Sequence, residues 1–160
     1  MRAMTIFLAF AAFACKGGAG TEYKHDEPRF KVTIPEGLQQ GPIKPDADGG
    51  GTLAFKNDDG SRDILLVWAR SGSPYDPEAQ WSRYGKEPDH VKTIAEGKLP
   101  GDVGKWIEHD RGRTYVHAVM SARSDDLAGP GGWGVLCMTS TPTAKPDAAL
   151  IAACKTLTSW

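Results

Sequence analysis

Four histidines are the residues of this sequence best suited to bind a metal ion or to act as a general base, and they are His25, His90, His109 and His117. His109 and His117 flank the dipeptide Arg111-Gly112, which the sequence predicts as a turn between two strands. In a two-residue turn Asp110 would face Arg113, and the two histidines would point to opposite faces of the sheet. We therefore predict no metal site, and we expect histidines that are solvated or lie at the edge of the core.

The same strand register gathers aromatic and polar side chains on one face of this predicted hairpin. Trp106 would pair with His117, and Glu108 with Tyr115. These four residues form a candidate partner-binding surface, with Trp106 and Tyr115 as its anchors. The alternative interpretation is the ordinary solvated face of an antiparallel sheet. The residues expected on the opposite, core-facing side are Ile107, Val116 and Ala118.

The remaining reactive residues form no catalytic constellation in the sequence. The nucleophile motif G-x-S-x-G is absent, and the serines of Ser71-Gly72-Ser73 have no adjacent base. The neighbouring acids Asp58-Asp59 and Asp125-Asp126 lack the spaced oxygen ligands and the glycine of a calcium loop. The glycine runs lack the Lys-Ser/Thr pair of a phosphate-binding loop. We therefore predict no catalytic residues, no cofactor and no enzymatic activity.

Cys137 and Cys154 are an even pair of cysteines once Cys15 is set aside. On the last predicted strand Cys137 lies on one face by period-two alternation, and on the terminal helix Cys154 lies within the apolar stripe that packs on the sheet. We therefore predict a disulfide that pins the helix to the sheet. The alternative is two buried free thiols, and without Cys-x-x-Cys spacing or an accompanying histidine the pair does not favour zinc.

The chain opens with a segment typical of a secretory signal. Arg2 precedes an apolar run, residues 4–14, which is far shorter than the roughly 20 residues of a membrane-spanning helix. The small residue before Cys15 resembles the lipobox of bacterial lipoproteins, in which the cysteine is acylated and becomes the new N-terminus. We expect residues 1–14 to be a signal peptide and residues 15–28 an acylated cysteine with a flexible tether. The alternatives are an ordinary secretory cleavage site and a buried N-terminal strand of a cytosolic protein.

Acylation of Cys15 would hold the protein on a membrane, because each methylene of the acyl chains that is buried in the bilayer contributes about 0.8 kcal/mol. We therefore expect the protein in the cell envelope, on a membrane facing the periplasm. In lipoproteins an Asp after the cysteine is the familiar signal for retention on an inner membrane, and here Lys16 occupies that position. We therefore favour the outer membrane if the host has two. The expected partners are the membrane and an envelope protein.

The rest of the chain is predicted to be one domain, residues 29–160, which is long enough to bury a core of its own. The net charge is −1, and basic and acidic residues are interspersed along the sequence. Because no basic stripe offers the electrostatic footprint that nucleic acid requires, we exclude nucleic acid as a partner.

Within this domain, alternation of apolar and polar residues predicts mostly strands. The predicted strands cover residues 29–35, 51–57, 62–70, 92–99, 104–110, 113–123 and 132–140. A short helix is expected over residues 74–86, and a terminal helix over residues 145–160, where Pro146 and Asp147 mark the start. The predicted fold class is α+β, with a twisted, mainly antiparallel sheet of about six to seven strands flanked by a short middle helix and a C-terminal helix.

This order of elements has a likeness to a known family. The stretch FKVTIPEGL over residues 30–38, the strands interrupted by one helix, and the closing strand and helix that end near LTSW resemble the PsbP/Mog-type (DcrB-like) fold. Many small bacterial lipoproteins resemble it too, and the likeness covers residues 29–160. It implies a family of binding and assembly-assisting proteins that generally lack enzymatic activity, and it implies no particular partner.

Two classes of function follow from these observations. The first is a membrane-anchored envelope lipoprotein whose domain is a non-enzymatic binding or assembly module. The alternative is a small-ligand receptor or a hydrolase with a site assembled from residues scattered along the chain. Convergent ionisable groups in a deep polar pocket would favour the alternative, and a shallow surface with exposed aromatic residues would favour the first class.

Overall fold

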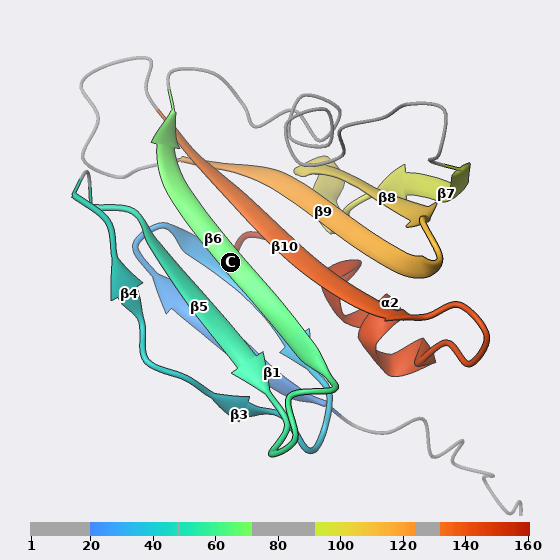
Figure 1. The fold of residues 1–160 in the computed structure, drawn as a ribbon. Helices are drawn as coiled ribbons and strands as arrows, with labels where there is room; N and C mark the ends of the chain where they lie inside the picture. The colour runs from blue at the N-terminus through green and yellow to red at the C-terminus, as the bar shows by residue number, and fades with distance from the viewer. Residues whose placement is uncertain (1–19, 48, 72–91, 124–131) are drawn as a thin grey trace, which may run out of the picture.

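The computed structural model describes residues 20–47, 49–71, 92–123 and 132–160 (Figure 1). This part of the chain contains ten strands, one α-helix and one 3-10 turn. The strands are β1 (Thr21–Asp26), β2 (Arg29–Ile34), β3 (Gln39–Gln40), β4 (Lys44–Pro45), β5 (Gly51–Lys56), β6 (Asp63–Ser71), β7 (Lys92–Lys98), β8 (Gly104–Asp110), β9 (Arg113–Arg123) and β10 (Gly132–Pro142). The α-helix is α2 (Ala148–Cys154), and the 3-10 turn is η2 (Pro100–Asp102).

The main sheet is antiparallel and follows the order β3-β5-β6-β10-β9-β8-β7, with β4 also paired to β5 (Figure 1). The two long strands β9 and β10 pair along their whole length at its centre. Because β10 joins β6 to β9, strands that are far apart in the sequence become neighbours.

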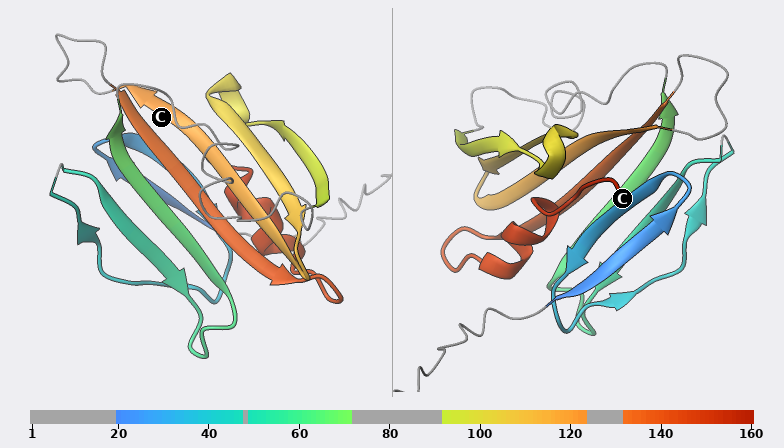
Figure 2. Two further views of the ribbon diagram at one scale, coloured as in Figure 1. Left: turned by 45° about the horizontal axis from the view of Figure 1, so that its top comes forward. Right: turned by 180° about the vertical axis from the view of Figure 1, so that it is seen from behind.

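A second layer covers one face of the main sheet. Strands β1 and β2 form a separate two-stranded antiparallel sheet, and this hairpin and α2 lie side by side on the same face (Figure 2). Backbone hydrogen bonds between Lys31 and Thr158, with N···O distances of 2.8 and 3.0 Å, join β2 to the chain after the helix. The core lies between the two layers, and its largest fully buried side chains include Phe30, Leu53, Ile64, Leu66, Met120, Leu150 and Leu157.

The predicted strands are found as β2 and β5 to β10, and the α+β class with a mainly antiparallel sheet is confirmed. The physical reason is the two-residue period of a strand, which places every second side chain on the core face. In β6, Ile64, Leu66 and Trp68 are buried in the core, whereas Leu65 and Val67 between them are half-buried on the other face.

Helix α2 begins where the sequence predicts and ends earlier. Asp147 is its N-cap, and its Oδ1 accepts hydrogen bonds from the backbone N–H groups of Ala149 (3.0 Å) and Leu150 (3.1 Å). The helix ends at Cys154, so the predicted extent of residues 145–160 is wrong. After the helix the chain extends, because Thr158 takes up its backbone hydrogen bonds with Lys31.

The predicted disulfide is present. Cys137 on β10 and Cys154 on α2 are bonded, with their Cα atoms 5.4 Å apart, and both side chains are completely buried. The bond joins the central strand of the main sheet to the helix that packs on it, so the face assignments predicted for the two cysteines are correct.

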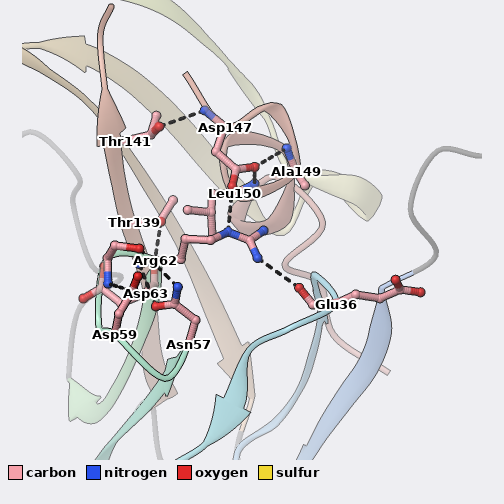
Figure 3. Close-up of polar contacts among 11 residues, drawn as sticks. Glu36, Asn57, Asp59, Arg62, Asp63, Thr139, Thr141, Asp147, Ala149 and Leu150 are labelled. Atoms are coloured by element: carbon pink, nitrogen blue, oxygen red, sulfur yellow. Dashed lines mark hydrogen bonds and ion pairs between the residues drawn. The ribbon is translucent and has the colours of Figure 1, made fainter. Parts of the chain in front are cut away.

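A polar network around Arg62 ties the start of α2 to two loops (Figure 3). The Arg62 Nε donates to Asp147 Oδ2 at 2.7 Å, and its Nη1 donates to the Glu36 carbonyl at 3.0 Å. The Arg62 backbone N–H donates to Asn57 Oδ1 at 3.0 Å, within the turn between β5 and β6. The Asp147 backbone N–H donates to Thr141 Oγ1 at 2.8 Å. The loop before β3, the β5–β6 turn and the helix start are therefore held together.

Two further sequence predictions concern the tether and the short middle helix. The tether expected over residues 15–28 is wrong in its second half, because residues 21–26 form β1 and pair with β2. The reason is that Tyr23 and His25 alternate with exposed residues along this segment, and their rings pack against Phe30. The short middle helix expected over residues 74–86 lies outside the described residues.

Candidate functional site

The candidate site lies on the second face of the main sheet, which we define as the face opposite α2 and the β1–β2 hairpin. Directly opposed residues of neighbouring strands share a face. One row of the second face contains Ser140, Tyr115 and His109 on β10, β9 and β8. The next row contains Leu65, Met138, His117 and Ile107 on β6, β10, β9 and β8.

A pocket of about 260 Å³ opens on the second face at the end where β6 begins. Its volume is below the usual 300–1,000 Å³ of small-molecule sites, so it suits a small ligand or a single side chain. The residues that line it are Asp63, Leu65, Arg111, Tyr115, His117, Met138, Thr139 and Ser140.

Two contacts position the middle of this pocket. The Ser140 Oγ lies 3.4 Å from both Nε and Nη2 of Arg113, which hold the hydroxyl from the β9 side. On the β6 side, Thr139 Oγ1 donates to the Asp63 carbonyl at 2.6 Å and so ties the start of β6 to β10. Because Ser140 is small, the space above it stays open between its larger neighbours.

The register predicted for β8 and β9 is wrong by one residue. Asp110 pairs with Thr114, and His109 with Tyr115, so the connecting loop has three residues. Gly112 has a φ of 75°, in the left-handed region, and its backbone N–H donates to Asp110 Oδ1 at 3.0 Å. A three-residue loop of this kind, with a residue in the left-handed region, is the usual alternative to a two-residue hairpin turn. It reverses which residues of β8 and β9 share a face.

As a consequence, His109 and His117 lie on the same face, with their ring centroids 6.1 Å apart. Both are buried, so the prediction that they are solvated or at the core edge is wrong. Burial lowers the pKa of His117 to about 4, helped by the positive charge that His109 would carry, and burial also lowers the pKa of His109. Both rings are therefore neutral near pH 7.

We predicted no metal site because the two histidines were expected on opposite faces, and in the observed register they share a face. Within the described residues, no group of three or more His, Cys, Asp or Glu side chains could hold a metal ion. The absence of a bound metal stays a prediction.

The four residues of the predicted partner-binding surface do not share a face. Tyr115 and His117 line the pocket on the second face. Trp106 and Glu108 point to the first face, opposite Ala118 and Val116. The expected core side is likewise divided, because Val116 and Ala118 face the core whereas Ile107 is buried on the second face.

Trp106 and Glu108 both contact Lys155, a residue of the protein itself. The Lys155 Nζ, just after α2, lies 2.8 Å from Glu108 Oε2 and 3.9 Å from the centre of the Trp106 ring. The ring also lies against Gly97 on β7, where a Cβ atom would come within 2.7 Å of it. The indole is therefore held between a glycine backbone and an ammonium group, and it helps to hold the helix end on β8.

Sequence reasoning did not find the other residues of the pocket. Asp63 and Leu65 come from β6, Met138 and Ser140 from β10, and Arg111 from the β8–β9 loop. No local motif unites them, because β6 and β10 meet only through the order of strands in the sheet. Their one signal in the sequence is alternation, which predicts that Leu65 faces away from Ile64 and Leu66.

Cys15, the predicted lipidation site, lies outside the described residues. Among the described residues, no helix is long and apolar enough to cross a membrane.

Comparison with known proteins bears on the fold. No protein-family model matches the chain, and no curated protein matches it. The solution structure of cyanobacterial PsbP (CyanoP) from Synechocystis sp. PCC 6803 is similar, with a TM-score of 0.56 and 12% sequence identity over 94% of this chain and 99% of that chain. The chain has a PsbP-like fold. The likeness of fold predicted from the order of elements is confirmed, and an identity of 12% shows the fold alone.

Proposed function

We propose that this protein is a membrane-anchored envelope lipoprotein whose PsbP-like domain is a non-enzymatic binding module. The observation that carries the proposal is the pocket on the second face, where opposite charges, a phenol, a neutral imidazole and two apolar side chains meet. A mixture of a few polar groups with apolar walls is typical of binding sites.

The contacts of the pocket favour binding over catalysis. A serine acts as a nucleophile when an adjacent base takes its proton. The Ser140 hydroxyl is contacted by the Arg113 guanidinium, which donates hydrogen bonds and accepts no proton. The neutral state of His117 near pH 7 is a consequence of burial, and its low pKa makes it a weak base.

The proposed membrane anchor is the lipid on Cys15. The short segment between Cys15 and the start of β1 limits how far the domain can lie from the membrane. From position 15 to position 21 the chain has six residue steps, which span at most about 22 Å when fully extended. An acylated Cys15 would therefore hold the domain close to the membrane surface, where the outer membrane is favoured because Lys16 follows the cysteine. The proposed partner is then an envelope component near that surface.

Metabolic labelling with radioactive palmitate tests the anchor. We expect the wild type to take up label and to fractionate with membranes, and Cys15→Ser to do neither. Equal labelling of both proteins would contradict the anchor.

Site-specific photo-crosslinking tests the binding module. A photoreactive residue at Tyr115, within the pocket, is compared in whole cells with one at Lys44, which is exposed on β4. We expect a discrete crosslinked species from position 115 only. Identical crosslinks from both positions would show that the second face is not the binding surface.

A further inference from the structure

The pocket has one acidic and one basic side. Asp63 lies at the start of β6, beside Ile64, whose cross-strand partner is Thr139. Ser140 follows Thr139 and pairs with Tyr115 on β9. Asp63 and Tyr115 therefore stand on either side of Ser140, about 10 Å apart at two strand spacings. Arg111 also lines the pocket and belongs to the loop that leads into β9, the strand of Tyr115.

One wall of the pocket, in the row next to Ser140, is largely apolar. Met138 pairs with Leu65 on one side and with His117 on the other, in the row next to Ser140. Leu65 and Met138 are half-buried, so they present apolar surface to the pocket. The burial that keeps His117 neutral lets its ring line the pocket without adding a charge.

Two other cations lie near the pocket but do not line it. Lys56 on β5 is the cross-strand partner of Asp63, and Arg113 contacts Ser140 from the rim. Among the described residues that line the pocket, the charges are one carboxylate and one guanidinium. A ligand with one charge of each sign matches this arrangement better than a simple anion, which Asp63 would repel.

We propose that this pocket binds a free α-amino acid with an apolar side chain. Asp63 accepts hydrogen bonds from the ligand's ammonium group, and Arg111 donates to its carboxylate. The ligand's side chain lies against Leu65 and Met138. This inference rests on the proposed binding function and names the chemical class of its ligand.

The dimensions agree with this assignment. The ammonium nitrogen and the carboxylate carbon of an amino acid are separated by two covalent bonds, or about 2.5 Å. With a charged hydrogen bond of about 2.8 Å at each end, the ligand bridges roughly 8 Å between protein groups. A pocket of about 260 Å³ has room for one molecule of this length.

Isothermal titration of the purified protein with three matched probes tests the proposal. The probes are L-leucine, isocaproate, which lacks the ammonium group, and isoamylamine, which lacks the carboxylate. We expect leucine to bind at least about tenfold more tightly than either analogue, because each charged hydrogen bond that is lost costs about 1.5–3 kcal/mol. Equal binding of all three probes, or no binding of leucine, would overturn the proposal.

Two variants test which residue binds which charged group of the ligand. Asp63→Asn and Arg111→Gln are each expected to weaken leucine binding about tenfold or more. Asp63→Asn should also remove the preference for leucine over isocaproate, and Arg111→Gln the preference over isoamylamine. The matched controls Glu36→Gln and Arg70→Gln, at exposed positions outside the pocket, are expected to change binding about twofold or less. Variants of Asp63 and Arg111 that bind like these controls would contradict the assignment, and the comparison of probes on the wild type does not depend on how any variant folds.

The same samples separate this proposal from the proposed function. Nuclear magnetic resonance spectra of leucine incubated with the protein should show the amino acid unchanged. Chemical conversion of leucine at this pocket would contradict the non-enzymatic binding module. If leucine does not bind but Cys15 is labelled and position 115 crosslinks, the ligand class is wrong and the binding module stands.

Discussion

Removal of the Asp147 side chain is expected to destabilise the whole domain, because this residue joins three parts of the fold. Its Oδ1 caps α2 through Ala149 and Leu150, and its Oδ2 binds the Arg62 guanidinium, which also holds the Glu36 carbonyl (Figure 3). Substitution of an N-cap residue by Ala costs about 0.5–2 kcal/mol. A partly exposed ion pair adds about 0.2–1 kcal/mol.

The expected loss for Asp147→Ala is therefore about 1–3 kcal/mol of the free energy of unfolding. For a domain of this size, 1 kcal/mol corresponds to about 4 °C, so the Tm should fall by roughly 4–12 °C. Asp147→Asn keeps an acceptor for the cap and loses the charge, and we expect it to cost about 0.2–1 kcal/mol. Asp46→Ala is the control, because the Asp46 carboxylate is exposed and, among the described residues, accepts a hydrogen bond from the Ala47 N–H.

The charge of Asp147 also predicts how the effect depends on pH. Burial raises the pKa of this carboxyl, but the hydrogen bonds from Leu150 and Arg62 and the charge of Arg62 outweigh burial, so the pKa lies below its ordinary value of 3.8. Because the pKa is lowered in the folded state, its stabilisation is fully present above that value and is lost as the pH falls further, through the folded pKa.

Thermal unfolding followed by circular dichroism, at pH 7 and then at pH 3 and below, measures these effects. We expect the difference between wild type and Asp147→Asn to shrink at the acidic end. A Tm for Asp147→Ala equal to that of the Asp46→Ala control would refute the cap. If Asp147→Asn lost as much stability as Asp147→Ala, the ion pair and not the cap would carry the effect.

Three further predictions concern the helix and the second face. Reduction of the bond between Cys137 and Cys154 should cost about 3 kcal/mol for a loop of this length and lower the Tm by about 10 °C, whereas an unchanged Tm in reductant would show that the bond does not hold the helix. Burial lowers the pKa of His117 to about 4, so the free energy of unfolding should fall by about 3 kcal/mol as the pH drops from 6.5 towards 4 and this residue becomes protonated. Denaturant titrations of His117→Gln at several pH values should lack this part of the pH dependence. Lys155→Met leaves the Glu108 carboxylate, which is 13% exposed, without its cation, and the free energy of unfolding measured in urea should fall by about 2 kcal/mol. An unchanged free energy of unfolding would mean that the pair contributes nothing.

The strands and the disulfide could be predicted because their signals are local. Residues such as Ile64, Leu66 and Trp68 repeat with the period of a strand, and that period alone decides which face they share. The same holds for Cys137 on its strand and Cys154 on its helix. The start of α2 is also local, because Asp is a preferred N-cap residue and Asp147 accepts from backbone N–H groups two and three residues on.

The register of β8 and β9 could not be predicted from the same kind of signal. Both strands carry apolar residues on each face, such as Ile107 on one and Val116 on the other, so alternation did not choose between a two-residue and a three-residue loop. The choice depended on Gly112 in the left-handed conformation and on its hydrogen bond to Asp110. One residue of difference separated Trp106 from Tyr115 and brought His109 beside His117.

The sequence by itself determined the faces of most strands and the helix cap, because each depends on residues within a few positions of one another. It also determined the class of fold and the cysteine pair, because the face of each cysteine follows from the local pattern of its own element, although the two are 17 residues apart. Only the tertiary structure decided where β1 adds to the domain and which strands are neighbours. The pocket is the clearest case, since Asp63, Ser140 and Arg111 come from three separate segments. They meet because β10 inserts between β6 and β9, and pairing over such distances in the sequence is decided by the packing of the whole sheet.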